Sequence, residues 1–141
     1  MKKILTGLTL WGVVSVSFAA TVTYTIVNNA DRDLVMHWPL GCSPDIYKTA
    51  KSFVSCSGMK KSGVMSPQST VECKILAAGF PIACFGKDPC LLRLYDKDSC
   101  SGADIATADI HFSGVFDHAE NEPGSRYHLV ASGNTVTINL K

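Results

Sequence analysis

The sequence predicts a small all-β domain, an antiparallel β-sandwich of about eight strands stapled by disulfides. Three observations lead to this fold class. Short segments of alternating apolar and polar residues recur along the chain, turn-forming residues separate them, and no segment has the period of an amphipathic helix. An open β-barrel, which uses the same strands, is the second choice.

Two strands are predicted near the start of the domain, over residues 21–27 and 34–38. β-branched residues fill much of the first strand, and the polar residues 28–33 are typical of a turn. Pro39 and Gly41 end the second strand. The residues predicted to face the core are Val22, Tyr24, Ile26, Leu34, Met36 and Trp38.

Residues 42–68 show no apolar period and are rich in Ser, Gly, Lys and Pro. We predict a long loop here, with at most one short helix or strand near residues 46–54. A loop of this length in a small domain is either functional or tied down, and Cys42 and Cys56 are placed to tie it.

The rest of the chain returns to the alternating pattern. Strands are predicted over 69–75, 82–85, 90–95, 105–112, 126–131 and 135–140. The last two form a hairpin around Gly133, and residues 113–125 are predicted to be a polar, acidic loop. The residues predicted to face inward are Val71, Cys73, Ile75, Leu92, Leu94, Ala106, Ala108, Ile110, Phe112, Val136, Ile138 and Leu140.

Residues 1–19 have the pattern of a secretory signal peptide. A short positive start and an apolar stretch precede Ser17 and Ala19, the small residues of a cleavage site, so the cut is predicted before Ala20. The pattern predicts that residues 20–141 form a single exported domain, either periplasmic or secreted. A short signal with two lysines and an alanine cut is typical of a bacterial exoprotein.

An exported chain meets an oxidising compartment, where cysteines pair. The six cysteines contain no Cys-x-x-Cys motif, which disfavours a zinc ribbon or a thioredoxin-type redox pair. We therefore predict three disulfides, with nearest neighbours as the first choice among the possible connectivities. These pairs are Cys42–Cys56, Cys73–Cys84 and Cys90–Cys100.

The charge balance excludes two classes of partner. Without residues 1–19, 11 basic residues face 12 acidic ones, which gives no general attraction to nucleic acid or to anionic membranes. No later apolar stretch approaches the roughly 20 residues of a transmembrane anchor. Lysines gather in the middle of the chain and acidic residues in its last third, a distribution typical of solvated surfaces.

We predict a non-enzymatic binding protein that engages an extracellular protein or glycan through the 42–68 loop, without a cofactor. Binding residues tend to lie on long loops held by rigid sheets. A mixture of cationic and aromatic side chains suits an anionic or sugar-bearing partner. The candidate binding residues are Tyr47, Lys48, Lys51, Phe53, Lys60 and Lys61.

A small secreted hydrolase is the first alternative. Asp109 and His111 share one face of a predicted strand, and His118 lies in the segment that follows. A histidine beside a carboxylate is the arrangement of a general base with its orienting partner. No Gly-x-Ser-x-Gly motif supplies a nucleophile, however, and six paired cysteines leave no free thiol.

A calcium-stabilised adhesion module is the second alternative. Asp96, Asp98 and Asp104 occupy the first, third and ninth positions of a possible calcium loop. Cys100 stands where the fifth position needs an oxygen ligand, glycine comes one position late, and no glutamate closes the loop. A polar turn between two strands therefore explains these residues better, and no metal site is predicted.

Residues 20–29, Ala-Thr-Val-Thr-Tyr-Thr-Ile-Val-Asn-Asn, resemble the first strand of thaumatin-like proteins. The resemblance covers about a tenth of the exported chain. That family is longer and far richer in cysteine, and its acidic cleft has no counterpart here that can be assigned residue by residue. The resemblance therefore implies a β-strand at this place and no family membership.

Overall fold

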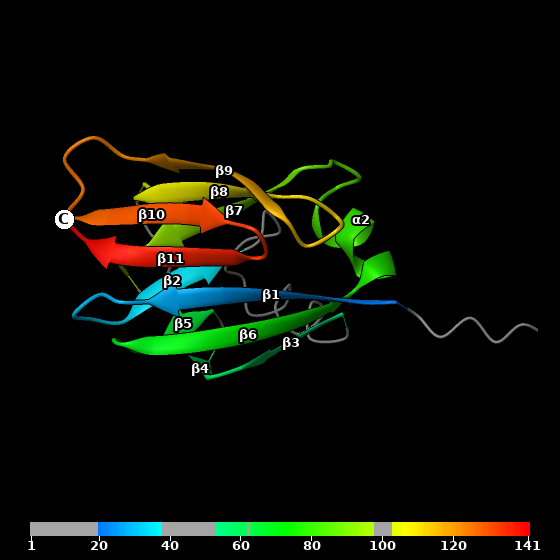
Figure 1. Ribbon diagram of the computed structural model, residues 1–141, viewed down its shortest axis with the longest axis horizontal. Coiled ribbons are helices and arrows are strands. Elements are labelled where there is room, and N and C mark those ends of the chain that lie inside the picture. The colour runs from blue at the N-terminus through cyan, green and yellow to red at the C-terminus, as the bar shows by residue number, and fades with distance from the viewer. Residues whose placement is uncertain (1–19, 38–52, 62, 98–102) are drawn as a thin grey trace, which may run out of the picture.

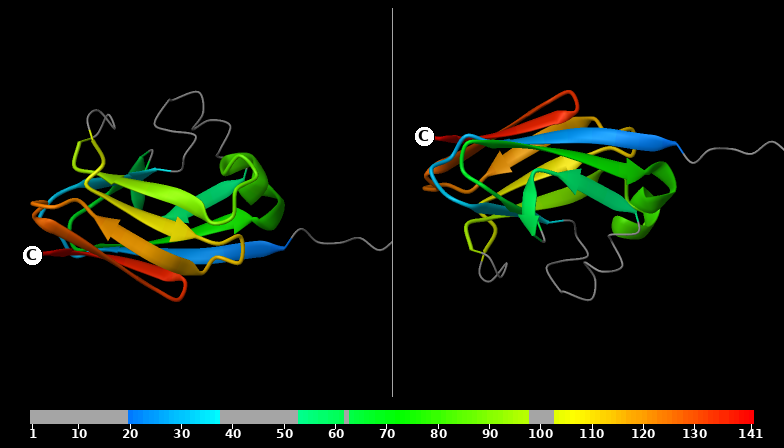
Figure 2. Two further views of the ribbon diagram at one scale, coloured as in Figure 1. Left: turned by 90° about the horizontal axis from the view of Figure 1, so that it is seen from above. Right: turned by 90° about the horizontal axis from the view of Figure 1, so that it is seen from below.

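The computed structural model describes residues 20–37, 53–61, 63–97 and 103–141. It confirms the predicted all-β sandwich, because the strands form a five-stranded and a six-stranded sheet that pack face to face (Figure 1 and Figure 2). A short helical segment lies at the end of the sandwich where β1 begins, and the C-terminus lies at the opposite end.

The five-stranded sheet is built around β1 (Thr21–Asn28). β1 runs antiparallel to β6 (Ser69–Leu76) on one side and parallel to β11 (Thr135–Leu140) on the other. β10 (Tyr127–Ser132) pairs with β11, and β3 (Val54–Ser57) pairs with β6, so these two strands form the edges. The first strand of the domain is therefore hydrogen-bonded to the last.

The six-stranded sheet is antiparallel throughout, in the order β4-β5-β2-β7-β8-β9. Its strands are β2 (Leu34–His37), β4 (Met59–Lys61), β5 (Val64–Met65), β7 (Cys90–Tyr95), β8 (Ala106–Ile110) and β9 (Phe116–Asn121). Between β6 and β7 the chain forms the 3-10 turn η1 (Ala77–Gly79) and the single helical turn α2 (Phe80–Ala83).

The core lies between the sheets and follows the alternation of the strands. The residues predicted to face inward are buried, with four qualifications. Leu140 is exposed near the chain end, Val22 and Phe112 are half-buried against the core, and Trp38 lies outside the described residues. Period-2 alternation therefore identified most of the core correctly.

Asn28, a polar residue that is fully buried, joins the two sheets at one end. Its side-chain Nδ2 donates to the carbonyl oxygens of Arg32 at 3.2 Å, Met65 at 3.3 Å and Ser66 at 2.9 Å. Its Oδ1 accepts from the backbone N–H of Ala30 at 3.0 Å. One amide thus links the β1–β2 turn to the start of the β5–β6 turn.

The sandwich is tied along one side, where the edge strand β9 approaches β10. The side-chain amide of Asn121 pairs with the backbone of Leu129 as a neighbouring strand would. Its Oδ1 accepts from the Leu129 N–H at 2.6 Å, and its Nδ2 donates to the Leu129 carbonyl at 3.0 Å. The Phe116 N–H also donates to the Gly133 carbonyl at 2.7 Å. These bonds cover part of an edge that otherwise invites aggregation.

The structure corrects the prediction of a loop over residues 42–68. β3, β4 and β5 lie between residues 54 and 65, whereas residues 42–52 lie outside the described chain. Strands of two to four residues are too short to show a period. Gly58 at φ +90° lies between β3 in one sheet and β4 in the other, and a Cβ there would meet the Thr70 carbonyl oxygen at 2.7 Å.

Two further predicted elements are wrong. Residues 82–85 do not form a strand, because the helical turn α2 begins at Phe80 and has Pro81 in its first turn, where a missing N–H costs nothing. Residues 113–125 are not entirely a loop, because β9 occupies part of them. β9 is an edge strand with mostly exposed residues and a register shift beside Asp109, so its sequence lacks alternation.

Both disulfides of the described chain differ from the predicted pairs. Cys56 bonds Cys73, its direct partner across β3 and β6, and Cys84 bonds Cys90. All three nearest-neighbour pairs are therefore wrong, because each contains a cysteine that has another partner. Register across the sheet, rather than separation along the chain, selects the Cys56–Cys73 pair. Cys42 and Cys100 lie outside the described residues.

Within the ranges that the structure describes, none of the helical segments has the length and apolar character needed to cross a membrane.

We expect Asn28→Ala to lower the free energy of unfolding by roughly 2–4 kcal/mol, because it leaves several buried backbone groups without a partner. Asn29→Ala is the matched control, since Asn29 is exposed and its side chain donates to Asn139 near solvent. Urea unfolding followed by tryptophan fluorescence measures both. Equal losses in the two variants would show that the buried amide has no special role.

The exported protein is expected to contain no free thiol and to have lost six hydrogens relative to the reduced chain, with its N-terminus at Ala20. Intact mass and peptide mapping without reduction check this. The maps must link Cys56 to Cys73 and Cys84 to Cys90, and three disulfides then require Cys42 to pair with Cys100. Maleimide labelling of the denatured, unreduced protein would contradict the prediction.

Candidate functional site

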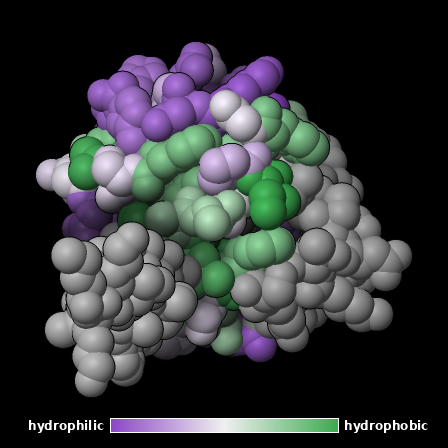
Figure 3. Space-filling model, turned by 90° about the vertical axis from the view of Figure 1, so that its right-hand side faces the viewer, coloured by the Kyte–Doolittle hydropathy of each residue, from purple (hydrophilic) through white to green (hydrophobic). Residues whose placement is uncertain are grey.

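The candidate site is a group of exposed apolar residues at the end of the sandwich that carries α2. We call Ile82, Phe85 and Val115 the apolar tip, and their exposed fractions are 52%, 66% and 45%. In Figure 3, apolar residues gather at the centre of this end, and hydrophilic residues lie above them. Large apolar side chains that gather at one exposed place are characteristic of interaction sites.

Phe85 is held in an unusual backbone conformation by a short covalent ring. It has φ +52°, a left-handed conformation that is costly for a bulky residue, and it directly follows Cys84 in the loop closed by the Cys84–Cys90 disulfide. The Gly86 N–H of this loop donates to the carbonyl of Pro81 in α2 at 2.8 Å. The loop thus presents an aromatic side chain to solvent on a constrained backbone.

Aromatic stacking attaches α2 to the end of β8. Phe80 is fully buried, and its ring stacks on the ring of Phe112 with centroids 5.4 Å apart. Phe53 packs against η1, since a Cβ on the buried Gly79 would lie 2.8 Å from the Phe53 Cβ. The segment that carries Ile82 and Phe85 is therefore packed against the rest of the domain.

A second attachment joins the disulfide loop to β8 and β9 through His111. The His111 Nδ1 lies 2.9 Å from the Asp88 Oδ1, and its Nε2 lies 3.4 Å from the Asp117 Oδ2. The hydrogen bond with Asp88 is the main cause that raises the pKa of His111, Asp117 adds to it, and partial desolvation opposes it. We call these three side chains the histidine clamp.

The structure describes the side chains of two of the six predicted binding residues, Phe53 and Lys60. Tyr47, Lys48 and Lys51 lie outside the described residues. Phe53 packs against Gly79, as shown above. The Lys60 ammonium forms an ion pair with Asp33 at 2.9 Å. Lys61 is the last residue of β4, and nothing is described of its side chain.

The sheet register brings two of the three candidate catalytic residues side by side. Asp109 of β8 is the register partner of His118 of β9. His111 lies just beyond β8 and instead contacts Asp88, from the disulfide loop, and Asp117. Sequence reasoning placed a carboxylate near His111 but missed Asp88, which is 23 residues away along the chain.

Of the three candidate calcium ligands, the structure describes Asp96, just after β7, and Asp104. Asp104 forms an ion pair with Arg93 at 2.9 Å, and Asp98 lies outside the described residues. Among the residues whose positions are described, no group of three histidine, cysteine or carboxylate side chains has the geometry of a metal site. A shallow cavity of about 330 Å³ does lie near Asp104, and its lining includes Thr107, Glu120 and Glu122.

Sequence analysis missed Phe85 because it assigned residues 82–85 to a strand. One signal was available, since Phe85 lies between two cysteines six residues apart in a segment that also contains Gly86 and Pro89. A ring that small turns the chain sharply and leaves little room to bury an aromatic side chain. Pairing Cys84 with Cys90 at the outset would have predicted an exposed Phe85.

Comparison with known proteins adds no further constraint: no protein-family model matches the chain, and no curated sequence or solved structure is significantly similar to it.

The histidine clamp predicts a pH dependence. Because the pKa of folded His111 is raised above its ordinary value of 6.5, the clamp's contribution to stability is complete below about pH 6.5 and is lost as the pH rises through the folded pKa. Asp88→Asn should move the NMR titration midpoint of His111 downward. Asp109→Asn is the control, because Asp109 is not among the groups that raise this pKa. Equal midpoints in wild type and Asp88→Asn would contradict the clamp.

Proposed function

We propose that the protein is an exported, non-enzymatic binding protein, periplasmic or secreted, which engages an extracellular protein or glycan through the apolar tip. The observation that carries this proposal is Phe85, 66% exposed and in a left-handed conformation within a disulfide-closed loop. The proposal keeps the function predicted from the sequence and moves the principal contact surface from residues 42–68 to the apolar tip.

The physical chemistry of binding supports this choice. An exposed aromatic side chain gains nothing from the core, and its positive φ costs of order 1–2 kcal/mol. A rigid aromatic anchor loses little conformational entropy when it enters a partner's pocket, and such anchors dominate interface energetics. The constrained backbone and exposed ring of Phe85 therefore favour binding to a partner, whereas they do not help the protein to fold.

Export is supported by two kinds of evidence. The two disulfides are compatible with an extracellular location. The pattern of residues 1–19 predicts a cleavable signal.

The geometry of the histidine clamp gives the hydrolase alternative no support. A general base needs one ring nitrogen free to take a proton from the nucleophile. Both ring nitrogens of His111 face carboxylates, an arrangement that stabilises the doubly protonated ring. Each cysteine in the described chain is part of a disulfide, so none of these four can act as a thiolate nucleophile.

The test compares capture by immobilised exported protein and by Phe85→Ser, from culture supernatant and on a glycan array. We expect Phe85→Ser to weaken capture by at least about tenfold, the loss typical of a binding anchor. Val130→Ser is the matched control, because Val130 is 41% exposed on β10 and lies outside the tip. Thermal melts of both variants check the fold.

Two paired variants separate this proposal from its rivals. Tyr47→Ala with Lys51→Ala tests the loop predicted from the sequence, and His111→Ala with His118→Ala tests the hydrolase. Loss of capture in the first pair alone would return the surface to residues 42–68. Loss of a biological effect in the second pair, with capture unchanged in Phe85→Ser, would replace binding with catalysis.

A further inference from the structure

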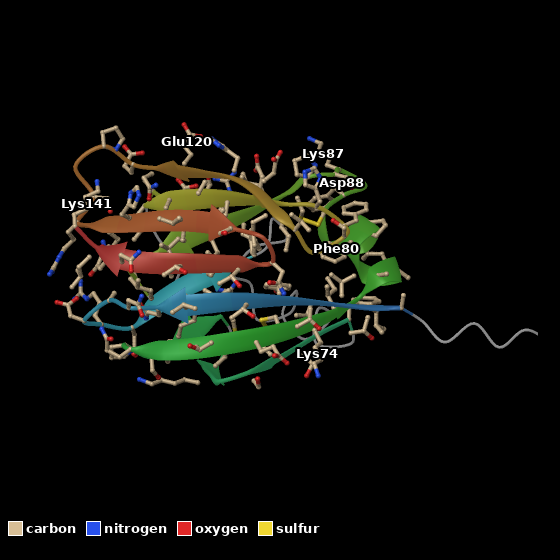
Figure 4. The ribbon with its side chains drawn as sticks, viewed as in Figure 1. Lys74, Phe80, Lys87, Asp88, Glu120 and Lys141 are labelled. Carbon is tan, nitrogen blue, oxygen red and sulfur yellow. A yellow bond between two sulfur atoms is a disulfide. The ribbon has the colours of Figure 1, made fainter. Side chains whose placement is uncertain are left out.

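Carboxylates extend from the apolar tip along the neighbouring edge strand. We call Asp88, Asp117, Glu120 and Glu122 the acidic row. Asp88 lies in the same disulfide loop as Phe85, Asp117 and Glu120 lie on β9, and Glu122 follows that strand. In Figure 4, Asp88 lies at the end of the molecule beside Lys87, and Glu120 lies further along the same edge.

The acidic row has little positive charge to balance it. Asp88 and Asp117 share one imidazole, that of His111. No lysine or arginine of the described chain forms an ion pair with Glu120 or Glu122, whereas the nearby Asp104 is paired with Arg93. Lys87, next to Asp88, is the one lysine of the disulfide loop. The edge beside the tip is therefore negative overall.

The row is spaced like side chains along an extended segment. Asp117 and Glu120 are three residues apart on β9, a separation of roughly 10 Å, and both are exposed because the register shift beside Asp109 interrupts the alternation of the strand there. At the far end, Glu120 and Glu122 line the shallow cavity of about 330 Å³ described above, together with Thr107. This cavity is wide enough for the head of a lysine or arginine side chain.

Resting on the proposed function, we propose that the apolar tip and the acidic row form one docking surface for a protein segment that places an apolar pocket or side chain next to lysine and arginine residues. The tip supplies burial of apolar area, and the row supplies charge complementarity, which sets orientation and the rate of association. The partner is thus a cationic protein surface.

The same charges disfavour two other occupants. An anionic lipid surface is repelled by the row, although Phe85 and Ile82 alone suit insertion into a bilayer. A second copy of the chain brings its own acidic row to the interface if the two tips meet, and like charges facing each other cost binding energy. A cationic partner is the occupant that satisfies both parts of the surface.

The probe is a phage-displayed library of random 12-residue peptides, selected on the full exported chain. We expect enriched peptides to combine aromatic or aliphatic residues with lysine or arginine, and to bind less tightly as salt increases. Phe85→Ser should weaken their binding by about tenfold and Glu120→Lys by about two- to fivefold. Matched controls are Val130→Ser and Glu72→Lys, since Glu72 is exposed on β6 of the other sheet.

The remaining outcomes separate this inference from the function on which it rests. If the enriched peptides contain no lysine or arginine, or if they bind Glu120→Lys as tightly as wild type, the cationic partner is overturned and the apolar tip remains the proposed binding site. Phe85-dependent sedimentation with phosphatidylcholine vesicles, without peptide enrichment, assigns the tip to lipid and overturns the inference. Two results count against both proposals. One is that no peptide is enriched and the protein does not bind vesicles, and the other is that Phe85→Ser binds the enriched peptides as tightly as wild type.

Discussion

The buried amide of Asn28 is the constraint on which the arrangement of the two sheets depends. An amide in an apolar core is costly unless its donors and acceptor are satisfied, and Asn28 is satisfied only if the β1–β2 and β5–β6 turns meet at one place. Because β1 lies in one sheet and β5 in the other, this condition fixes how the sheets approach each other at this end. Apolar packing alone would allow the two sheets to shift slightly relative to each other, whereas the hydrogen bonds of Asn28 would break if they did.

The opposite end of the sandwich is organised differently, and the apolar tip is built there. η1 and α2 connect β6 of one sheet with β7 of the other, so this short segment must cross the end of the core. The Phe80 ring fills that end, and its stacking on Phe112 places the segment against β8. With Phe80, Ala83 and Cys84 buried on one side of this segment, Ile82 and Phe85 are left on its exposed side.

The sequence predicted the fold class and most of the core because long strands such as β1, β6 and β11 alternate over six to eight residues. It did not predict β4, β5 or β9, where strands are very short or mostly exposed and pairing with neighbours decides the structure. The candidate site was predicted only in part. His111 was recognised, but Asp88 and Phe85 depend on the Cys84–Cys90 ring, and the pairing of six cysteines cannot be read from spacing.

Three different interactions hold the tip, and each responds to a different condition. The Cys84–Cys90 bond is sensitive to reductant, the histidine clamp to pH, and the Phe80–Phe112 stack to neither. The stack belongs to the core, because Phe80 is fully buried, whereas the clamp lies at the surface. Asp88 also belongs to both the clamp and the acidic row. Deprotonation of His111 removes the positive charge that Asp88 and Asp117 share, so the surface that a cationic partner meets becomes more negative.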